Sequence, residues 1–578
     1  MINIKEDVSL NVLNHSCAHL MAQAVKRLYP EALFWVGPVI SEGFYYDIDL
    51  GDKAISEEDL QLIEKEMKKI SKDGKRITRE TLTKEQALEM FKDDPYKVDL
   101  ISSMDEKETV ITCYRQGEFV DLCRGPHVDT VKEIKHFKLL KVSGAYWKGD
   151  AKNKMLQRVY GICFESEEDL EKHLFLLEEA KKRDHKKLGR ELELFMISEY
   201  APGMPFFLPK GMIVRNILEQ YWYEEHQKEG YVFVKTPIMM SKELWEVSGH
   251  WFNYRENMYV AEVEDRDFAI KPMNCPGGML VYKNGLHSYK DLPIRMGELG
   301  QVHRNEASGA LNGLFRVRAF TQDDAHIFMT PDQIEEEIVK IIRLIERVYG
   351  HLGLEFKIEL STRPEDKYIG SLEIWERSEA ALAAACKAAG KDYKINPGDG
   401  AFYGPKLDFH IQDSLGRVWQ CGTIQLDMNL PERFDLTYVD QNGEKQRPVM
   451  LHRVIFGSIE RFIGILIEHF AGAFPLWLAP DQIVIIPVHH ENHLEYAKKI
   501  EAKLLENGFR VYVDDRNEKL GYRIREAQTK KVPIQLVLGD GEIDGQNVTA
   551  RRFGSKESST LLIDEFLELI IQEREKKQ

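Results

Sequence analysis

The stretch ELGQVHRNEASGALNGLFRVRAFTQDDAH, residues 298–326, has the pattern of a hairpin with charged side chains on one face. Arg304 and Glu306 are two residues apart, so on a strand their side chains would point to the same side. The run ASGALNGL predicts a loop, because small and turn-forming residues predominate in it. The returning strand repeats the alternation with three further residues: Arg316, Arg318 and Phe320. The segment therefore predicts a surface that carries arginines, a carboxylate and an aromatic ring.

Such a surface has the groups that bind a nucleotide. Arginine pairs with phosphate in a planar geometry, glutamate can accept a hydrogen bond from an exocyclic amine, and phenylalanine can stack on a base. The alternative is an ordinary charged hairpin, which an Arg-x-Glu pattern by itself does not exclude.

A helix is predicted over residues 456–470, FGSIERFIGILIEHF. Its apolar positions share one helical face: Ile459, Phe462, Ile463, Leu466, Ile467 and Phe470. Arg461 projects almost opposite to that face, with Gly457 and Gly464 nearby. An arginine in this position is normally solvated, but the small glycines would also let a ligand lie against it.

The chain has 578 residues, which at about 150 residues per domain predicts three to four domains. The segments suggested by composition and pattern are 1–165, a linker helix over 166–189, 190–478 and 479–578. The long third segment has an α+β pattern. The last segment alternates short β-branched runs with helical stretches, which predicts a small α/β domain with a mostly parallel sheet.

Composition excludes several classes of protein. Lysine plus arginine number 79 and aspartate plus glutamate 95, so the net charge is −16. This excludes a basic coat over the whole surface, although local basic patches for phosphate remain compatible with it. No run approaches about 18 uncharged apolar residues, so no transmembrane helix is expected. Seven scattered cysteines and an opening without a secretory pattern favour the reducing cytosol.

Two groups of residues have the chemistry of metal ligands. His15 and His19 are four apart on a predicted helix, and Cys123 and His127 have the same spacing across a Gly-Pro turn. A metalloprotease helix would carry glutamate after the first histidine, where this chain has Ser16. The residues alone leave open a zinc site, a metal-free polar pocket and unrelated core positions. A second, dispersed group has no spacing that links its members: Cys275, His326 and His452.

Together these elements resemble the motifs of class II aminoacyl-tRNA synthetases. The predicted helix and strand that end at Pro237 resemble motif 1, the Arg304 hairpin resembles motif 2 and the Arg461 helix resembles motif 3. Four further segments, in chain order, are specific to the threonyl-tRNA synthetase family: KPMNCPGG, FTQDDAHIF, WQCGTIQLD and LHR. The resemblance covers essentially the whole chain. It implies an α+β multidomain fold with an antiparallel-sheet catalytic core, an N-terminal α+β editing domain and a C-terminal α/β anticodon-binding domain.

The resemblance also implies roles for residues of the core. One Zn²⁺ would be held by Cys275, His326 and His452, and Mg²⁺ would enter with ATP. The residues implied to bind ATP are Arg304, Glu306, Phe320, Gln420 and Arg461. Arg304 would contact the α-phosphate and the threonine carboxylate, Arg461 the γ-phosphate, and Arg316 would act nearby as the third catalytic arginine. The residues implied to line the threonine pocket are Gln322, Asp324 and Tyr403, with Asp324 on the hydroxyl.

Further roles follow for the two flanking domains. The residues implied to shape the editing pocket, which the family generally uses without a metal, are His15, His19, Lys97, Asp121, Cys123 and His127. Three residues match positions that read the anticodon: Asn517, Glu542 and Arg551. The implied partners are ATP, L-threonine, tRNA(Thr) and a second copy of the chain, in a cytoplasmic homodimer without membrane contact.

One chemical reason connects the synthetic and editing sites. Threonine and valine differ by hydroxyl versus methyl, and an apolar pocket separates such a pair by only ~100-fold. A zinc ion with an open position could read the hydroxyl. Serine has the same hydroxyl and lacks only a methyl group, a difference of roughly 1–3 kcal/mol. The implied activity is therefore attachment of threonine to tRNA(Thr), with hydrolysis of mischarged seryl-tRNA(Thr) at a second site.

Some features depart from the family pattern, and two other interpretations remain. The family usually begins with a small ubiquitin-like domain, whereas this sequence opens with the editing-like region. Gly278 and Asn312 stand where many members have histidine. Another class II enzyme, such as a prolyl-tRNA synthetase, is disfavoured by the three candidate zinc ligands and by TQDDAH. A catalytically silent tRNA- or mRNA-binding paralogue is disfavoured by the intact motif 2 and motif 3 arginines.

Overall fold

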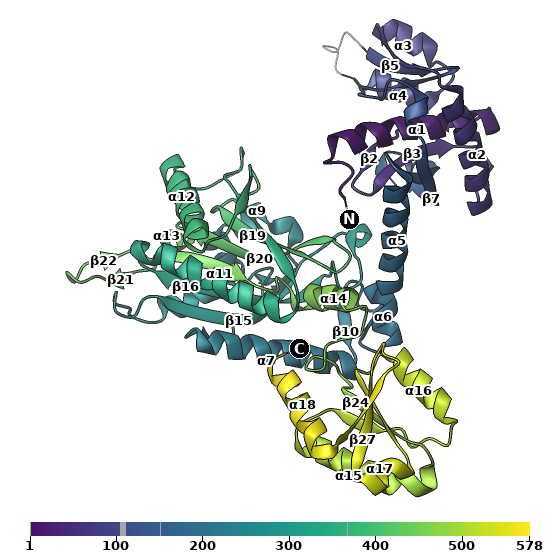
Figure 1. The fold of residues 1–578 in the computed structure, drawn as a ribbon. Helices are drawn as coiled ribbons and strands as arrows, with labels where there is room; N and C mark the ends of the chain where they lie inside the picture. Colours follow the sequence, from purple (N-terminus) through teal and green to yellow (C-terminus); the bar gives the residue numbers. More distant parts are fainter. Residues whose placement is uncertain (1, 105–110, 151, 367, 578) are drawn as a thin grey trace. The chain divides into compact units, whose positions relative to one another are not determined.

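The computed structural model divides into two compact units, residues 1–179 and 180–578, each with its own sheets and core (Figure 1). The residues that it describes are 2–104, 111–150, 152–366 and 368–577. Within that part of the chain, no helix combines the length and the apolar character needed to cross a bilayer.

The first unit is an α+β domain built around helix α1 (Val8–Leu28). Asp7 caps this helix by accepting a hydrogen bond from the Leu10 amide. Helix α1 packs against β3 and β8 of a five-stranded sheet, and a separate sheet has the order β4-β5-β6. The other elements are β1 (Leu33–Phe34), β2 (Val39–Ile40), β3 (Gly43–Asp49), α2 (Glu57–Asp73), β4 (Ile77–Leu82), α3 (Lys84–Met90), α4 (Pro95–Ser102), β5 (Ile111–Gln116), β6 (Phe119–Leu122), β7 (His136–Tyr146) and β8 (Met155–Phe164).

An eight-stranded sheet forms the centre of the second unit, in the order β11-β15-β16-β23-β20-β19-β17-β18. Only the edge strands β11 and β18 run parallel to their neighbours; the inner pairings are antiparallel. The strands are β11 (Val232–Phe233), β15 (Ile294–His303), β16 (Ala319–Met329), β17 (Glu355–Ser361), β18 (Tyr393–Asn396), β19 (Lys406–Gln412), β20 (Val418–Asp427) and β23 (Val449–Val454). The sheet therefore has the antiparallel core that the family resemblance implies.

Helices and small sheets surround this central sheet (Figure 1). Helices α11 and α12 pack on β17, and α14 packs on β16. The helices are α7 (Pro209–Lys228), α8 (Lys242–Ser248), α9 (His250–Asn253), α10 (Cys275–Lys283), α11 (Ile334–His351), α12 (Leu372–Ala388), α13 (Leu430–Arg433) and α14 (Ile459–His469). The small strands are β9 (Phe195–Ile197), β10 (Pro205–Phe207), β12 (Met239–Ser241), β13 (Val260–Val263), β14 (Arg266–Ile270), β21 (Tyr438–Val439) and β22 (Lys445–Gln446).

The motif 2 hairpin is shorter than the alternation predicts. Strand β15 ends at His303 and β16 begins at Ala319, so Arg304, Glu306, Arg316 and Arg318 lie in the connecting loop rather than on strands. The reason is that two backbone amides of this loop donate hydrogen bonds to carbonyl groups elsewhere in the chain and not to the opposite side of the hairpin. The Asn305 amide donates to the Asn257 carbonyl at 3.0 Å, and the Arg318 amide donates to the Gly203 carbonyl at 2.6 Å.

The linker is two helices rather than one. Helix α5 (Glu167–Arg183) ends before Asp184, and α6 (His185–Glu191) begins after it. Asp184 has a non-helical φ of −47° and ψ of 118°, and its side chain accepts hydrogen bonds from the Lys186 and Lys187 amides. An aspartate in this role starts a new helix, which explains the break.

The C-terminal part, from about residue 480, has a five-stranded sheet in the order β25-β24-β26-β27-β28. Strands β25, β24 and β26 are parallel, whereas β27 and β28 are antiparallel additions, so the sheet is more mixed than predicted. Its elements are β24 (Ile483–Pro487), α15 (His490–Glu506), β25 (Val511–Val513), α16 (Leu520–Thr529), β26 (Ile534–Leu538), α17 (Asp540–Gly545), β27 (Asn547–Arg552), β28 (Ser558–Leu562) and α18 (Ile563–Glu575).

Asp323 of β16 holds the turn that leads into α14. Its carboxylate accepts hydrogen bonds from the amides of Ile455 (2.8 Å), Phe456 (3.0 Å) and Gly457 (2.9 Å). Burial raises the pKa of Asp323 to about 6, so the group is ionised at neutral pH. Gly457 has a φ of +80°, and a Cβ atom there would lie 2.7 Å from the Cys421 carbonyl oxygen, so this turn requires glycine.

Replacement of Asp323 by asparagine is expected to lower the free energy of unfolding at neutral pH by about 1–3 kcal/mol, because the new NH₂ group would face a buried amide donor. Urea denaturation followed by tryptophan fluorescence measures this change. The matched control is Asp440→Asn, which alters a carboxylate that also accepts backbone hydrogen bonds but is exposed. Equal effects of the two substitutions would contradict the role given to Asp323.

Candidate active site

A cavity of about 400 Å³ lies between the motif 2 loop, strand β20 and the start of α14. It brings together the five residues that the sequence assigned to ATP, which are up to 157 positions apart: Arg304, Glu306, Phe320, Gln420 and Arg461. Arg316, the third arginine assigned to catalysis, also lines it. The Arg304 guanidinium lies 5.1 Å from the centroid of the Phe320 ring. The cavity is therefore lined by an aromatic ring and by three guanidinium groups.

Some polar groups of this cavity already have hydrogen-bond partners in the protein. Arg316 Nε donates to Glu306 Oε2 at 2.9 Å, and Gln420 Nε2 donates to Asp408 Oδ1 at 2.7 Å. Arg461 Nε, in contrast, is buried and has no hydrogen-bond partner among the described residues. A buried guanidinium nitrogen without a partner costs free energy unless a ligand satisfies it.

A second cavity, of about 220 Å³, adjoins the first, and Arg304, Gln322 and Thr423 line both. It contains the residues that the sequence assigned to threonine, Gln322, Asp324 and Tyr403. The Asn274 side-chain amide donates to Asp324 Oδ2 at 3.2 Å, and the Tyr403 hydroxyl donates to Gln425 Oε1 at 2.7 Å. Two cavities that share an arginine suit two substrates that must react with each other.

The three dispersed metal-ligand candidates meet beside this second cavity. The ligand atoms of Cys275, His326 and His452 all lie within 4.8 Å of one another. Strand pairing causes this, because His326 of β16 is directly opposite His452 of β23, while Cys275 begins helix α10. Three ligands of this kind fit Zn²⁺ with an open coordination position.

The surroundings of these three residues also fit a metal. Burial lowers the pKa of His326 to about 4, so its ring is neutral, and within the described structure its Nε2 is buried without a hydrogen-bond partner. His452 Nε2 contacts Asp427 Oδ2 at 2.9 Å, which leaves Nδ1 for a ligand and fixes the ring orientation. Burial raises the pKa of the Cys275 thiol, which a metal ion would counteract. The departure at Gly278 matters here, since a Cβ atom there would lie 3.2 Å from His326 Nδ1.

The structure adds residues that the sequence interpretation did not single out. Thr423 and Gln425 line the second cavity, and Asp427 orients His452. These three polar residues alternate with isoleucine and leucine in the segment TIQLD of β20. That alternation was a usable signal, because it places the three side chains on one face of the strand.

A further cavity, of about 400 Å³, lies in the first unit. Five of the six residues assigned to editing line it: His15, His19, Lys97, Asp121 and Cys123. The sixth, His127, is not part of the lining but contacts it through Cys123. Cys123 Sγ lies 3.2 Å from His15 Nε2 and 3.1 Å from His127 Nε2. Lys97 Nζ pairs with Asp121 Oδ1 at 2.5 Å, and the Tyr46 hydroxyl donates to the other oxygen of Asp121.

Electrostatics keep the histidines of this cavity neutral. Burial lowers the pKa of His15 and of His19, and lowers that of His127 to about 2. Burial also raises the pKa of Cys123 to about 12, so it is a thiol rather than a nucleophilic thiolate at neutral pH. Three neutral imidazoles and a thiol can orient water or hold a metal, and ligand atoms of the four residues lie within 4.8 Å of one another.

The three candidate anticodon residues lie in the C-terminal domain. Asn517 is exposed after β25, Glu542 is in α17 and Arg551 is in β27. The Glu542 carboxylate already accepts hydrogen bonds from the Gly539 amide (2.8 Å) and the Thr549 hydroxyl (2.7 Å). Arg551 Nε donates to the Ser555 carbonyl at 2.8 Å. Both side chains are thus held in fixed orientations.

Comparisons with known domain families match three parts of the chain. Residues 258–470 match "tRNA synthetase class II core domain (G, H, P, S and T)", and residues 482–573 match "Anticodon binding domain". Residues 111–160 match "Threonyl and Alanyl tRNA synthetase second additional domain". These matches confirm the predicted fold class, with a class II core between an editing-type domain and an anticodon-binding domain.

Individual relatives are similar over nearly the whole chain. The threonine–tRNA ligase of Fusobacterium nucleatum subsp. nucleatum is 59% identical over 577 residues, covering 99% of this chain and 92% of the relative. Threonine–tRNA ligase 2 of Bacillus subtilis is 56% identical over 579 residues, covering 100% of this chain and 90% of the relative. The crystal structure of the RNA binding domain of threonyl-tRNA synthetase from Cryptosporidium parvum Iowa II covers 68% of this chain and 98% of its own, with a TM-score of 0.65 and 42% identity. On this identity and coverage, together with the class II core, the chain belongs to the threonine–tRNA ligase family.

Proposed function

We propose that the two adjoining cavities of the second unit bind ATP and L-threonine, and that the chain joins threonine to tRNA(Thr). The observation that carries this proposal is the wall shared by the two cavities, which Arg304, Gln322 and Thr423 form. The reaction requires the threonine carboxylate to reach the α-phosphorus of ATP. A guanidinium that faces both cavities can hold these two anionic groups together.

The main role of the arginines in activation would be to offset negative charge on the reacting groups. The carboxylate attacks the α-phosphorus, a mixed anhydride with AMP forms and pyrophosphate leaves. Arg304 would offset the charge between the reacting groups, and Arg461 and Arg316 the charge on the leaving pyrophosphate, aided by the Mg²⁺ that accompanies ATP. Phe320 would stack on adenine and Glu306 would accept from its amine. The Glu306–Arg316 ion pair, 2.9 Å long without substrate, would open as ATP enters.

The amino-acid side chain would be recognised in the second cavity. Asp324, oriented by Asn274, would accept a hydrogen bond from the threonine hydroxyl, and Gln322 and Tyr403 would line the remainder. Cys275, His326 and His452 would hold Zn²⁺. When bound, the ion would supply a Lewis-acidic position that a hydroxyl group satisfies and a methyl group does not. After activation, a ribose hydroxyl at the 3′ end of tRNA attacks the carbonyl carbon and AMP leaves.

The substitution Cys275→Ala is expected to lower the zinc content from about one ion per chain to near zero, because only two protein ligands remain. Threonine-dependent ATP–pyrophosphate exchange should fall to background. Metal analysis by mass spectrometry, the exchange assay and a melting curve measure the three quantities. Folding should persist, since the site lies beside a cavity and not in the large core of the unit.

The matched control is Cys386→Ala, which removes a buried thiol of α12 outside both cavities and should keep zinc and activity. Full activity in zinc-free protein would contradict the zinc proposal. A value of two ions in the parent chain and one in Cys275→Ala would instead place a second metal in the N-terminal cavity.

We also propose that the N-terminal cavity hydrolyses seryl-tRNA(Thr). Its neutral imidazoles suit a general base or an anchor for the attacking water. The Lys97–Asp121 pair is buried at 3% and 2% exposure and can orient the ester and the ribose hydroxyls. A tight pocket can exclude the extra methyl of threonine, because steric rejection is stronger than a lost contact.

Replacing both His15 and His19 by alanine should leave threonylation near the parent rate and let seryl-tRNA(Thr) accumulate, because the water would lose its anchors. Deacylation of purified seryl-tRNA(Thr) measures this. The control is His136→Ala, which changes a histidine of β7 that pairs with Glu167 outside the cavity. Unchanged deacylation in the double variant would exclude this cavity as the editing site.

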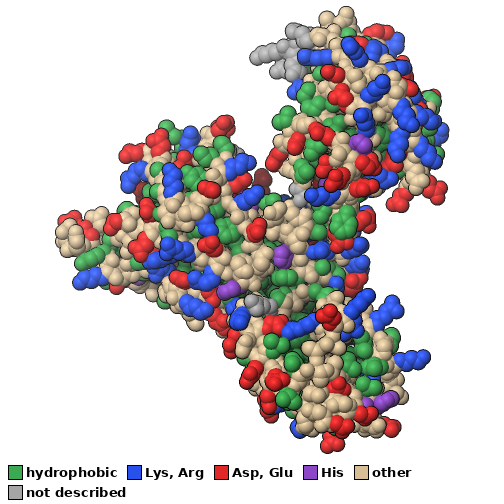
Figure 2. Space-filling view, in the orientation of Figure 1, with side chains coloured by type: hydrophobic (Ala, Val, Ile, Leu, Met, Phe, Trp, Pro, Cys, Tyr) green, Lys and Arg blue, Asp and Glu red, His purple; other side chains and the backbone are tan. Residues whose placement is uncertain are grey.

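Binding of tRNA must be local, given the net charge of −16. On the face that Figure 2 shows, basic and acidic side chains are mixed over the surface rather than separated into one basic field. We propose that Asn517, Glu542 and Arg551 contact the anticodon. Arg523, a basic residue of α16, is 2% exposed and donates to the Pro487 and Asp514 carbonyls, so it stabilises the domain and is not placed to contact tRNA. The cytosol is the compartment that suits this reaction, and all seven cysteines, which lie in the described ranges, are free thiols.

A homodimer through motif 1 completes the proposal. The predicted strand is reduced to the two-residue edge strand β11, which pairs on one side only. Val232, Ile238 and Met239 in and after this strand are 55%, 42% and 46% exposed. An edge strand with exposed apolar residues suits an isologous contact with a second copy.

The double substitution Val232→Asp with Met239→Asp should convert a dimer, of twice 67.1 kDa, into monomer at micromolar concentration. Buried charges would oppose the isologous contact. Light scattering measures the mass. Leu505→Asp, at a 53% exposed apolar position of α15, is the control and should remain dimeric. A parent chain that is monomeric and fully active would contradict the proposal.

A further inference from the structure

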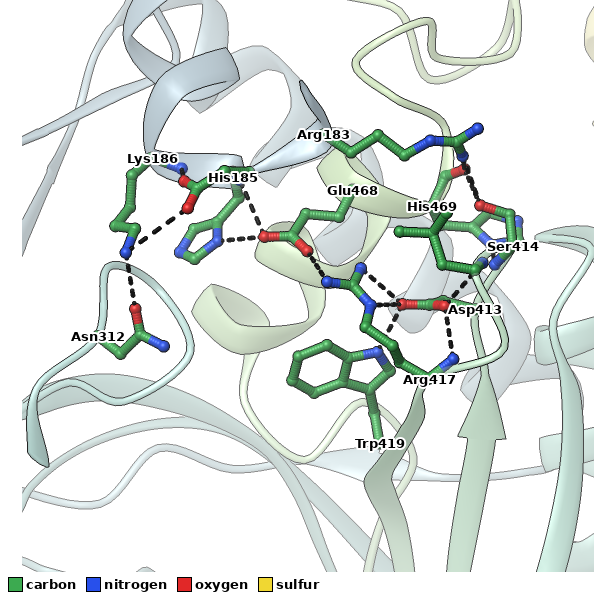
Figure 3. Close-up of polar contacts among 12 residues, drawn as sticks. Arg183, His185, Lys186, Asn312, Asp413, Ser414, Arg417, Trp419, Glu468 and His469 are labelled. Carbon is green, nitrogen blue, oxygen red and sulfur yellow. Dashed lines mark hydrogen bonds and ion pairs between the residues drawn. The ribbon is translucent and has the colours of Figure 1, made fainter. Parts of the chain in front are cut away.

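A buried cluster of polar side chains connects the start of α6 to α14 and to the turn between β19 and β20 (Figure 3). We call His185, Glu468, Arg417 and Asp413 the α6 cluster. Glu468 Oε1 accepts hydrogen bonds from the His185 amide (2.9 Å) and lies 2.7 Å from His185 Nδ1. Arg417 pairs with Glu468 Oε2 at 2.6 Å and with Asp413 Oδ2 at 2.7 Å. None of these four residues has a role in the activity described above.

The second nitrogen of His185 reaches the motif 2 loop. His185 Nε2 accepts a hydrogen bond from the Leu314 amide at 3.0 Å. Because Nε2 is an acceptor here, Nδ1 carries the proton and donates it to Glu468. One neutral imidazole therefore joins a carboxylate of α14 to the backbone of the loop. The side chains of His185 and Glu468 are only 1% and 4% exposed, so water cannot readily replace either contact.

The loop fits closely around this ring. Gly313 has a φ of +49°, and a Cβ atom there would lie 2.2 Å from His185 Nε2. The Phe315 ring lies 3.9 Å from the His185 ring and 4.5 Å from the Trp419 ring, measured between centroids. Beside this contact, Lys186 Nζ donates to Asn312 Oδ1 at 3.1 Å, as Figure 3 shows.

The elements joined by the α6 cluster also form the ATP cavity. Phe315 and Arg316, directly after Leu314, line that cavity. Helix α14, which carries Glu468, also carries Arg461. Strand β20 supplies Gln420, next to Trp419, whose indole Nε1 donates to Asp413 at 2.9 Å. A change at His185 would thus be transmitted to the cavity through one residue of loop backbone.

Asp184, His185 and Glu468 also lie close enough together to suggest a metal site. The hydrogen bonds argue against this. Both ring nitrogens of His185 already have protein partners, and the Arg417 guanidinium pairs with the second oxygen of Glu468. A cation would have to displace the Arg417 guanidinium from Glu468, so the group functions as a hydrogen-bonded connection.

We propose that His185 is a positioning residue for ATP: through the Leu314 amide it holds the motif 2 loop so that Phe315 and Arg316 face the nucleotide. The inference rests on the proposed location of the ATP site. It assigns to the linker, which is otherwise a connection between domains, a part in binding of the nucleotide but none in recognition of threonine.

Two substitutions of His185 test its two side-chain hydrogen bonds one at a time. In His185→Gln the amide oxygen reaches the former position of Nε2 and can accept from the Leu314 amide, but the contact with Glu468 is lost. In His185→Asn the NH₂ group reaches the former position of Nδ1 and can donate to Glu468, but the side chain is too short to reach Leu314. The backbone hydrogen bond from His185 to Glu468 remains in both variants.

The measurements are KM for ATP and for threonine in the pyrophosphate exchange assay, and hydrogen exchange of the Leu314 amide. His185→Asn should raise KM for ATP about fivefold to tenfold, and leave KM for threonine unchanged, because one buried hydrogen bond to the loop is lost. Exchange of the Leu314 amide should accelerate about tenfold. His185→Gln should stay close to the parent in all three measurements.

Equal effects of the two variants would overturn the inference, since a purely structural role at the start of α6 predicts no difference between them. Absence of any effect on KM for ATP would also overturn it. His351→Gln, which alters a histidine bonded to the Tyr221 hydroxyl away from the cavities, is the control and should change neither KM. If the proposed function itself were wrong, the parent chain would show no threonine-dependent pyrophosphate exchange. Hydrogen exchange of the Leu314 amide would still test the contact between His185 and the loop in that case.

Discussion

Strand β16 is hydrogen-bonded along both edges, to β15 and to β23, and the site depends on the register of these pairings. Because side chains alternate along a strand, Phe320, Gln322, Asp324 and His326 point to the same face. One strand therefore contributes an aromatic ring, an amide, a carboxylate and an imidazole in sequence along the two cavities. A slip of one residue would turn all four away.

The opposite face of the same strand stabilises the arrangement. Asp323 accepts three amide hydrogen bonds from the turn before α14, and this turn fixes the position at which Arg461 enters the cavity proposed for ATP. Residues proposed to bind substrates and residues with a structural role thus alternate along β16. The site also contains buried polar atoms that have no hydrogen-bond partner among the residues the structure describes, including Gln322 Oε1 and Arg461 Nε. Such atoms are costly in a folded protein and indicate groups that are oriented in advance for a ligand.

The synthetic and N-terminal cavities use different electrostatics. The cavity proposed for ATP is lined by guanidinium groups, which suit a substrate with several negative charges. The N-terminal cavity has neutral imidazoles, a neutral thiol and the charge pair of Lys97 with Asp121, and its lining also includes Lys5 and Arg124. Hydrolysis of an ester requires a positioned water and little added charge, whereas activation of a carboxylate by ATP requires strong neutralisation. The groups that line each cavity therefore suit the chemistry proposed for it.

Local pattern in the sequence indicated many of the elements and the chemical groups, and the motifs indicated the family, but the length of the motif 2 strands and the break in the linker helix were not predicted. The motif 2 segment, the apolar face of α14 and the alternation TIQLD in β20 are all visible without a structure, because periodicity reports which face of an element is buried. The sequence did not reveal which of these groups lie next to one another. Cys275, His326 and His452 are far apart in the chain, and only the pairing of β16 with β23 and the position of α10 bring them together. The contact of His185 with Leu314 spans 129 positions and likewise has no local signal. The sequence by itself determined which chemistry is present; the tertiary structure decided which groups meet, because long-range strand register and burial are set by the whole core and not by neighbouring residues.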